Sequence, residues 1–300
     1  MSFGAIADDY DRLRPGPPDA AVDWLLPLNC EVAVDLGAGT GLLTRQLARR
    51  VARVVAIEPD DRMGAVLRAR SPGVEVIPGK AEDIPLPDAS ADGVFVSSAW
   101  HWMDPDLAVP EIGRVLRDGG RFGVIWAGRD HQAGWLREIG GLRDPVSADP
   151  AGQGGTDAAG QGRAGAHGQG GTDAHGQGRA GAHGQGGTDA HGQGGTGAHG
   201  QGGDRRRSRH HDVTLPVTGL FTNMETTSFG FTRAMTISGI IDMLATYSGF
   251  ITASPEDRAA ALDRARTALT QRFDGASEID VPMRASCWRA DRTDRTYQAD

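Results

Sequence analysis

One short stretch constrains the fold more than any other part of the chain. Residues 32–41 read Val-Ala-Val-Asp-Leu-Gly-Ala-Gly-Thr-Gly, an apolar run that carries one acid and is followed by alternating glycines. Such a run is typical of a buried strand, and glycine allows the tight turn that other residues cannot adopt. The leucine spacing of residues 42–50 predicts a helix packed on a sheet. Together they predict an α/β unit with a ligand at the carboxyl end of the strand.

Two acids indicate which ligand this turn receives. The glycines are spaced G-x-G-x-G, whereas dinucleotide sites have G-x-G-x-x-G. Asp35 lies at the end of the first strand, where a carboxylate disfavours a pyrophosphate and suits an ammonium group. The second predicted strand, residues 53–57, is followed by Glu58, and a carboxylate there can accept both hydroxyls of a ribose. The predicted ligand has a cationic amino-acid end and a nucleoside end, as S-adenosylmethionine does.

Four stretches together resemble a known family. They are VDLGAGTG (34–41), AIEPD (56–60), GKAEDIPLPDASADGVFVSSAWHW (79–102) and EIGRVLRDGGRFGVIW (111–126). In this order they resemble class I S-adenosylmethionine-dependent methyltransferases, specifically the small-molecule branch related to trans-aconitate methyltransferase. The resemblance covers residues 1–130 and 213–292, roughly. It implies an α/β, Rossmann-like fold with seven strands, the last of them antiparallel, and helices on both faces.

The resemblance also implies where the cofactor S-adenosylmethionine binds. The N-terminal segment would be a lid, although a leader that only packs on the sheet edge is the alternative. The loop after the third predicted strand, residues 74–77, would surround the adenine, with Glu82 or Asp83 receiving its amine, although a polar surface turn is the alternative there. The expected cofactor residues are Tyr10, Arg14, Asp35, Gly37, Ala38, Gly39, Gly41, Glu58, Pro59, Ala81, Glu82 and Ser98.

Aromatic residues follow the fourth and fifth predicted strands, residues 92–97 and 121–126. Rings at the ends of these strands can exclude water and attract a sulfonium through their π-faces. A histidine between two tryptophans can act as a base or as a hydrogen-bond donor, although the tryptophans could instead cap the core while the histidine bonds to backbone. We predict His101 as the catalytic residue and Trp100, Trp102, Trp126 and, from the resemblance, Tyr247 as acceptor-binding residues.

The composition changes completely at about residue 148. A glycine-rich eight-residue repeat runs to Asp204, and a basic stretch closes it at residues 205–211. Its small side chains offer too little apolar surface to offset the entropy of ordering the chain. We therefore predict a disordered insertion at 148–211 in one methyltransferase domain, with a cofactor-binding part at 1–147, a C-terminal part at 212–292 and a tail at 293–300. The repeated histidines suggest metal binding, but a flexible chain gives them no shared face, and no metal site is predicted.

The remaining composition limits the partners. The 300 residues carry a net charge of −8, which disfavours a nucleic-acid partner. No stretch reads as a signal peptide or a membrane span, so we expect a cytoplasmic protein that acts on a small molecule. The oligomeric state is not predicted. The two cysteines predict neither a disulfide framework nor a metal cluster.

Two prolines raise questions about individual elements. Residues 105–116 predict a helix, but Pro110 requires the helix to start there or to kink. Residues 279–287 alternate as a half-buried strand, and Pro282 suits an edge or a bulge. A sixth strand is predicted at residues 226–232.

The expected reaction moves a methyl group from S-adenosylmethionine to an oxygen, or to a nitrogen, of a small metabolite, with a carboxylate as one candidate. Because a sulfonium is a good leaving group, the enzyme mainly has to orient the acceptor and the methyl group in a dry site. Two other functions remain open. A nicotinamide-dependent oxidoreductase would share the sheet and the ribose acid, but it favours the other glycine spacing. A cofactor-binding protein without turnover would result if the insertion damaged the acceptor site.

Overall fold

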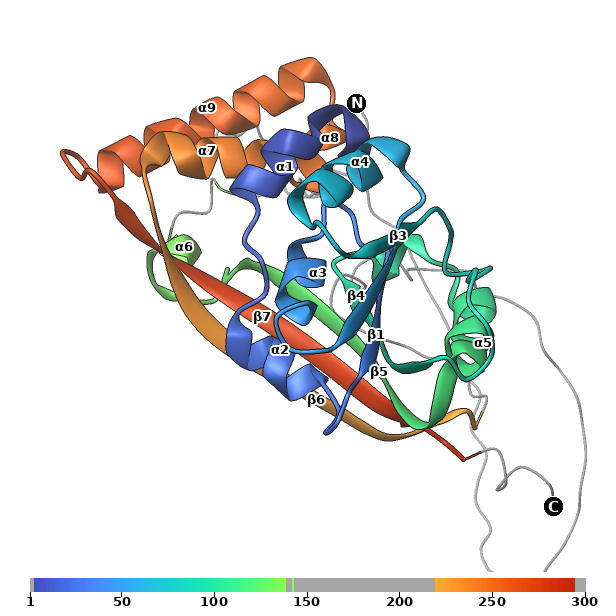
Figure 1. Ribbon diagram of the computed structural model, residues 1–300. Helices are drawn as coiled ribbons and strands as arrows, with labels where there is room; N and C mark the ends of the chain where they lie inside the picture. Colours follow the sequence, from blue (N-terminus) through green and yellow to red (C-terminus); the bar gives the residue numbers. More distant parts are fainter. Residues whose placement is uncertain (1–2, 139–141, 143–218, 295–300) are drawn as a thin grey trace, which may run out of the picture. The chain divides into compact units, whose positions relative to one another are not determined.

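A seven-stranded sheet organises the part of the chain that the computed structural model describes, residues 3–138, 142 and 219–294 (Figure 1). The chain divides into two units, Met1–Ala148 with Arg206–Asp300 and, separately, Asp149–Arg205. The predicted insertion at 148–211, with its repeated histidines, lies outside the described residues. All that follows concerns the first unit.

The sheet has the order β3-β2-β1-β4-β5-β7-β6. The strands β1 to β5 pair parallel with one another, whereas β7 runs antiparallel to both β5 and β6. The predicted seven-stranded sheet with an antiparallel last strand is therefore confirmed. The strands are β1 (Val32–Leu36), β2 (Arg53–Ile57), β3 (Glu75–Ile77), β4 (Ala91–Ser97), β5 (Leu116–Arg129), β6 (Phe221–Met235) and β7 (Ile279–Arg292).

Helices from the N-terminal and C-terminal parts of the chain pack against each other. Figure 1 shows α1, near the N-terminus, beside α4 and α7, and α7 beside α9. None of the described helices is long and apolar enough to cross a lipid bilayer. They are the 3-10 turns η1 (Phe3–Ile6) and η2 (Trp100–Trp102) and the α-helices α1 (Ala7–Leu13), α2 (Asp19–Leu25), α3 (Leu42–Leu47), α4 (Asp61–Arg70), α5 (Pro105–Val115), α6 (Gly134–Glu138), α7 (Ile237–Ala245), α8 (Ser248–Ile251) and α9 (Pro255–Arg272).

The core lies on both faces of the sheet, because successive strand residues point to opposite sides. On one face Val34 and Leu36 of β1 pack in a cluster with Ile112 of α5. On the other face Ala33 and Phe95 pack in a cluster with α2 and α3. A third cluster joins α7 and α9 to the start of β7. Parallel strands covered on both sides read as continuous apolar runs, which explains why β1, β2 and β4 were predictable from the sequence.

The two prolines are accommodated without breaking their elements. The helix α5 begins at Pro105, capped by the Asp104 side chain, and continues through Pro110. Although β7 is not an edge strand of the sheet, its pairing with β5 ends at Met283, so Pro282 has a strand partner only in β6. The Pro282 oxygen accepts a hydrogen bond from the Asp130 N–H on the β5 side. The Pro282 nitrogen, which carries no hydrogen, therefore faces the side where β5 has ended, and no strand hydrogen bond is lost there.

Candidate functional site

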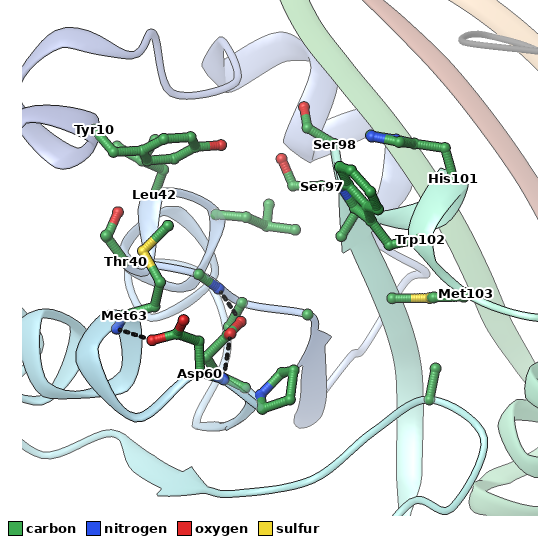
Figure 2. Close-up of a pocket in the computed structure, with 18 of the residues that line it drawn as sticks. Tyr10, Thr40, Leu42, Asp60, Met63, Ser97, Ser98, His101, Trp102 and Met103 are labelled. Carbon is green, nitrogen blue, oxygen red and sulfur yellow. Dashed lines mark hydrogen bonds between the residues drawn. The ribbon is translucent and has the colours of Figure 1, made fainter. Parts of the chain in front are cut away.

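A pocket of about 820 Å³ opens at the carboxyl ends of β1, β2 and β4 (Figure 2). Its walls are the turn after β1, the loops after β2, β3 and β4, the helix α1 and the short helix α8. The predicted site residues that line it are Tyr10, Arg14, Gly37, Ala38, Gly39, Glu58, Pro59, Ala81, Glu82, Ser98, His101 and Trp102. Five other predicted residues, Asp35, Gly41, Trp100, Trp126 and Tyr247, do not line it.

The glycine turn after β1 forms the floor of this pocket. Gly37, Gly39 and Gly41 have φ angles of +70°, +58° and +88°, a region that disfavours residues with a Cβ. A Cβ added to Gly37 would lie 2.9 Å from the Cβ of Ala99, so this glycine is also required by packing. A Cβ on Gly39 would meet nothing within 4 Å. The turn therefore exposes its backbone at Gly39 to open space in the pocket, while Gly41 starts α3.

Asp35 lies beneath this turn and not on the pocket wall. Its side chain is fully buried, and its Oδ2 accepts a hydrogen bond of 2.6 Å from the Thr44 hydroxyl of α3. Its Oδ1 has no hydrogen-bond partner among the described residues. Burial raises the pKa of this carboxyl from 3.8 to about 7, a shift that the Thr44 hydrogen bond opposes. Asp35 could thus act on a ligand only through its charge and through the turn above it.

Glu58 follows β2 and does line the pocket. Its Oε2 accepts a hydrogen bond of 2.7 Å from the Gly39 N–H, and its Oε1 accepts one of 2.9 Å from the Asp60 N–H. These two bonds fix the carboxylate against the glycine turn and leave lone pairs on both oxygens for a ligand. Burial raises the pKa of Glu58 above its usual value, although the two backbone hydrogen bonds oppose that shift.

Asp60, which also lines the pocket, starts the next helix. Its Oδ1 accepts hydrogen bonds from the Arg62 and Met63 N–H groups, which caps α4. Figure 2 shows the bond from Met63. Gly4 of the N-terminal segment approaches so closely that an added Cβ would lie 2.5 Å from the Asp60 side chain. The capping carboxylate therefore lies between the helix α4 and the N-terminal segment.

We expect the Asp60→Ala substitution to lower the free energy of unfolding by about 1 kcal/mol, because it leaves the first N–H groups of α4 without an acceptor. Asp60→Asn, which keeps an oxygen acceptor, should recover most of this loss. Urea unfolding curves give both values. The matched control is Asp61→Ala, which removes an acid from the first turn without removing the cap; equal losses for Asp60→Ala and Asp61→Ala would contradict the assignment.

The loop after β3 forms the wall next to Glu58. Gly79, Lys80, Ala81 and Glu82 line the pocket, whereas Asp83 does not. The Glu82 Oε1 accepts a hydrogen bond of 2.9 Å from the backbone N–H of Asp104, which ties this loop to the start of α5. Of the two carboxylates considered for an adenine amine, Glu82 is the one that faces the pocket.

The opposite wall comes from the end of β4. Figure 2 shows Ser97, Ser98, His101 and Trp102 across the pocket from Tyr10. Ser98 has a φ of +55°, and its N–H donates to the Ile125 oxygen, so backbone pairing with β5 holds this strained residue in place. The rings of His101 and Trp102 lie 4.8 Å apart. Trp102 is 60% exposed, so it forms a rim that a bound molecule could cover.

The structure corrects the position of two predicted acceptor residues. Trp100 is only 5% exposed and packs in the core, with its ring 5.3 Å from that of Phe122. Trp126 is 6% exposed and belongs to the same cluster. Trp100 therefore agrees with the alternative that the two tryptophans beside His101 cap the core, whereas Trp102, at 60% exposed, does not. The reason is local: η2 turns Trp100 inward and leaves Trp102 outward.

Tyr247 is also behind the pocket wall rather than in it. It precedes α8, and the wall itself is formed by Ser248, Ile251 and Thr252. The predicted site residues did not include these three residues, nor several neighbours of the motifs. These neighbours adjoin the glycine turn or the ends of β2, β3 and β4, and this adjacency was a usable signal for them. They are Thr40, Leu42, Leu43, Asp60, Met63, Gly79, Lys80, Ser97, Ala99 and Met103.

Comparison with known proteins agrees with this geometry. Residues 34–124 match the family model of a methyltransferase domain, a range that contains the glycine turn, Glu58 and the β4 end. An uncharacterized methyltransferase of Mycobacterium tuberculosis is 49% identical over 150 residues, which are 49% of this chain and 62% of that protein. An uncharacterized methyltransferase-like protein of Schizosaccharomyces pombe is 35% identical over 46% of this chain and 56% of its own length. The chain thus spans about three fifths of the length of these relatives.

One solved structure covers nearly the whole chain. A protein of Anaeromyxobacter dehalogenans, described as a proposed type II methyltransferase, superposes with a TM-score of 0.56 over 93% of this chain and 96% of its own. At 21% sequence identity, this likeness concerns the fold. The predicted resemblance to class I methyltransferases is therefore confirmed for the fold and for the domain at residues 34–124; the more specific link to trans-aconitate methyltransferase is not tested.

Proposed function

We propose that this chain, which carries a methyltransferase domain at residues 34–124 on a class I methyltransferase fold, binds S-adenosylmethionine and methylates an oxygen, or a nitrogen, of a small metabolite. The observation that carries the proposal is one pocket that combines the open glycine turn at Gly39 with the fixed carboxylate of Glu58. A volume of about 820 Å³ is in the range that small-molecule and cofactor sites have.

The residues of the pocket fit the two ends of this cofactor. Glu58 presents acceptor lone pairs suited to a ribose, and the loop at Ala81 and Glu82 would surround the base. The buried carboxyl of Asp35 favours a positive charge above the turn. Met63 and Leu42 supply apolar surface between these groups.

Bound S-adenosylmethionine would supply an electrophilic methyl group on a sulfonium. The chain's own contribution is then to hold an acceptor in line and to exclude water, which is the largest part of the catalysis that such a reaction needs. His101 and Trp102, next to Ser97 and Ser98, form the wall where the acceptor would lie. His101 would accept a proton from a hydroxyl acceptor, whereas a carboxylate acceptor would need no base.

Isothermal titration calorimetry with S-adenosylhomocysteine and with NAD⁺ tests the cofactor. We expect binding of the first and none of the second, and the reverse result would favour an oxidoreductase. A screen of carboxylic acids and phenols for methyl transfer then tests the reaction. Cofactor binding with no turnover on any acceptor would instead support a protein that has kept its cofactor site and lost its acceptor site.

A further inference from the structure

The loop between β3 and β4, residues 78–90, forms one wall of the pocket and runs beside α5 (Figure 1). All its residues are described, and none of them belongs to a helix or to a strand of the sheet. Its middle reads Ile84-Pro85-Leu86-Pro87. Proline has no N–H to donate and biases the residue before it towards extended backbone, so this stretch offers few hydrogen-bond partners for its own carbonyl groups.

Two charged side chains of α5 supply partners to this loop. The Glu111 Oε2 accepts a hydrogen bond of 2.9 Å from the Ile84 N–H. Arg114 donates from Nη2 to the Ile84 oxygen and from Nη1 to the Leu86 oxygen, each at 2.8 Å. The same Nη1 donates to the Asp88 Oδ1 at 2.9 Å. One pair of side chains thus holds three residues of the loop.

Glu111 and Arg114 also fix each other. The Arg114 Nε donates to the Glu111 Oε1 at 2.8 Å, and its Nη2 donates to the Glu111 Oε2 at 2.7 Å. The pair is half-buried, and the hydrogen bond from Arg114 lowers the pKa of Glu111 below its usual value, although burial opposes that shift. Two parallel bonds between a planar guanidinium and a carboxylate leave little freedom to either group. The loop is therefore bonded to a rigid part of α5.

The bonded stretch reaches the pocket through packing. Ile84 and Ala81 are buried in the same core cluster as the inward-facing residues of α5. A Cβ added to the pocket-lining Gly79 would lie 2.9 Å from the Pro85 Cδ, so the Pro85 ring packs directly on this glycine. Between Gly79 and Ile84, Glu82 lines the pocket and accepts a hydrogen bond from the backbone N–H of the residue that caps α5. Contacts with the start and with the second half of α5 therefore fix the place of Glu82.

We propose that Glu111 and Arg114 are positioning residues for the choice of cofactor: they hold the loop so that Glu82 receives the amine of the adenine. The proposal rests on the proposed function, because the contact that the pair would fix is one between Glu82 and the bound base. Neither Glu111 nor Arg114 lines the pocket, so the pair acts only through the loop. A pair that only stabilised the fold would affect the free energy of unfolding and leave the choice of base unchanged.

The choice of base is measured with two ligands that differ at one group. S-inosylhomocysteine carries an oxygen where S-adenosylhomocysteine carries the amine, so it presents an acceptor to the Glu82 carboxylate in place of a donor. We expect the parent to bind the adenosyl ligand about 10- to 100-fold more tightly in calorimetry, and Arg114→Gln to bind the two ligands within about 3-fold of each other. The ratio of the two affinities is the readout, because a general loss of packing weakens both ligands alike.

Three further variants locate the effect. Arg117→Gln is the matched control, because Arg117 follows α5 and pairs with Asp92 rather than with the loop, and it should keep the parent's ratio. Glu82→Ala should lose the ratio while Glu111 and Arg114 remain, which shows that the ratio reports on Glu82. Arg114→Lys keeps the charge without the planar fork and should give a ratio between those of the parent and Arg114→Gln.

Two results would overturn the proposal. One is a folded Arg114→Gln protein that keeps the parent's ratio, and the other is a parent that binds S-adenosylhomocysteine and S-inosylhomocysteine equally well. Should Arg114→Gln fail to fold, Glu111→Gln decides: it keeps one oxygen but removes the charge from the pair, so a smaller loss of the ratio is expected, and an unchanged ratio overturns the proposal. A parent that binds neither ligand refutes the proposed function instead.

Discussion

Replacing Glu58 by glutamine is expected to weaken the binding of S-adenosylhomocysteine by about 100-fold or more, because hydrogen bonds to a charged acceptor contribute about 1.5–3 kcal/mol each. The carboxylate is fixed by the N–H groups of Gly39 and Asp60, one on each oxygen. Glutamine offers one oxygen and one NH₂ group, so one of these backbone N–H groups would face another donor. The variant should therefore lose a ribose contact and also the position of the glycine turn.

Two comparisons separate these losses from general unfolding. Asp61→Asn changes a neighbouring acid that does not cap α4, and it should bind the ligand as the parent does. An analogue of S-adenosylhomocysteine without the ribose 2′-hydroxyl should bind the parent more weakly, while Glu58→Gln should discriminate little between the two ligands. Calorimetry gives the affinities, and thermal unfolding shows whether the variant is folded. A folded Glu58→Gln protein that binds as tightly as the parent would place the ribose elsewhere.

The parts of the site that could be predicted from the sequence are those in which the backbone itself is the functional element. Alternating glycines after an apolar strand require positive φ angles wherever the chain folds, and Gly37 and Gly39 have them. Glu58 was predictable because parallel strands end at the same edge of a sheet. Neither inference needed knowledge of side-chain packing.

Side-chain direction in irregular segments could not be predicted. Trp100 and Trp102 are two residues apart, yet the 3-10 turn buries the first and exposes the second. Ser248, Ile251 and Thr252 reach the pocket from a helix of four residues more than 100 positions after His101. No local pattern marks such residues, because their place depends on how α7 packs against α1 and α8 against α7.

Asp35 shows a third limit of sequence reasoning. An acid at the end of a buried strand can face the ligand or the adjacent helix, and the alternation of β1 decides between them only once the packing of α3 is known. Here the side chain points to Thr44 of α3. Sequence reasoning placed the carboxylate at the right end of the right strand, but it did not foresee that the group would be enclosed.

This enclosed carboxyl leads to the second large effect. Burial raises the pKa of Asp35 to about 7 in the folded protein, against an ordinary value of 3.8. Below pH 4 the Asp35 carboxyl is protonated in both the folded and the unfolded protein, so it does not lower the free energy of unfolding. As the pH rises from 4 to 7, the unfolded chain loses this proton and the folded chain keeps it, so the free energy of unfolding falls by about 1.4 kcal/mol per pH unit. Above pH 7 the total reduction in the free energy of unfolding approaches about 4 kcal/mol.

We therefore expect Asp35→Asn to be more stable than the parent by up to about 4 kcal/mol at pH 8, with the difference shrinking towards zero at pH 4. Urea unfolding of both proteins between pH 4 and 8.5 measures this difference. The exposed acid of Asp61→Asn serves as the control and should show no such trend. A difference between Asp35→Asn and the parent that does not change with pH would mean that the carboxyl is ionised in the folded protein throughout this range.

The same carboxyl should report on the charge of the ligand. A cation bound above the glycine turn favours the ionised form of Asp35, so binding of S-adenosylmethionine near pH 7 should release part of a proton from the parent. Calorimetry in two buffers with different ionisation enthalpies measures this release, and it should be smaller for Asp35→Asn. The variant would then gain stability and lose affinity, because the cost of burying the acid is offset only when a positively charged ligand is bound. Equal proton release from the two proteins would show that the ammonium and sulfonium charges lie too far from Asp35 to act on it.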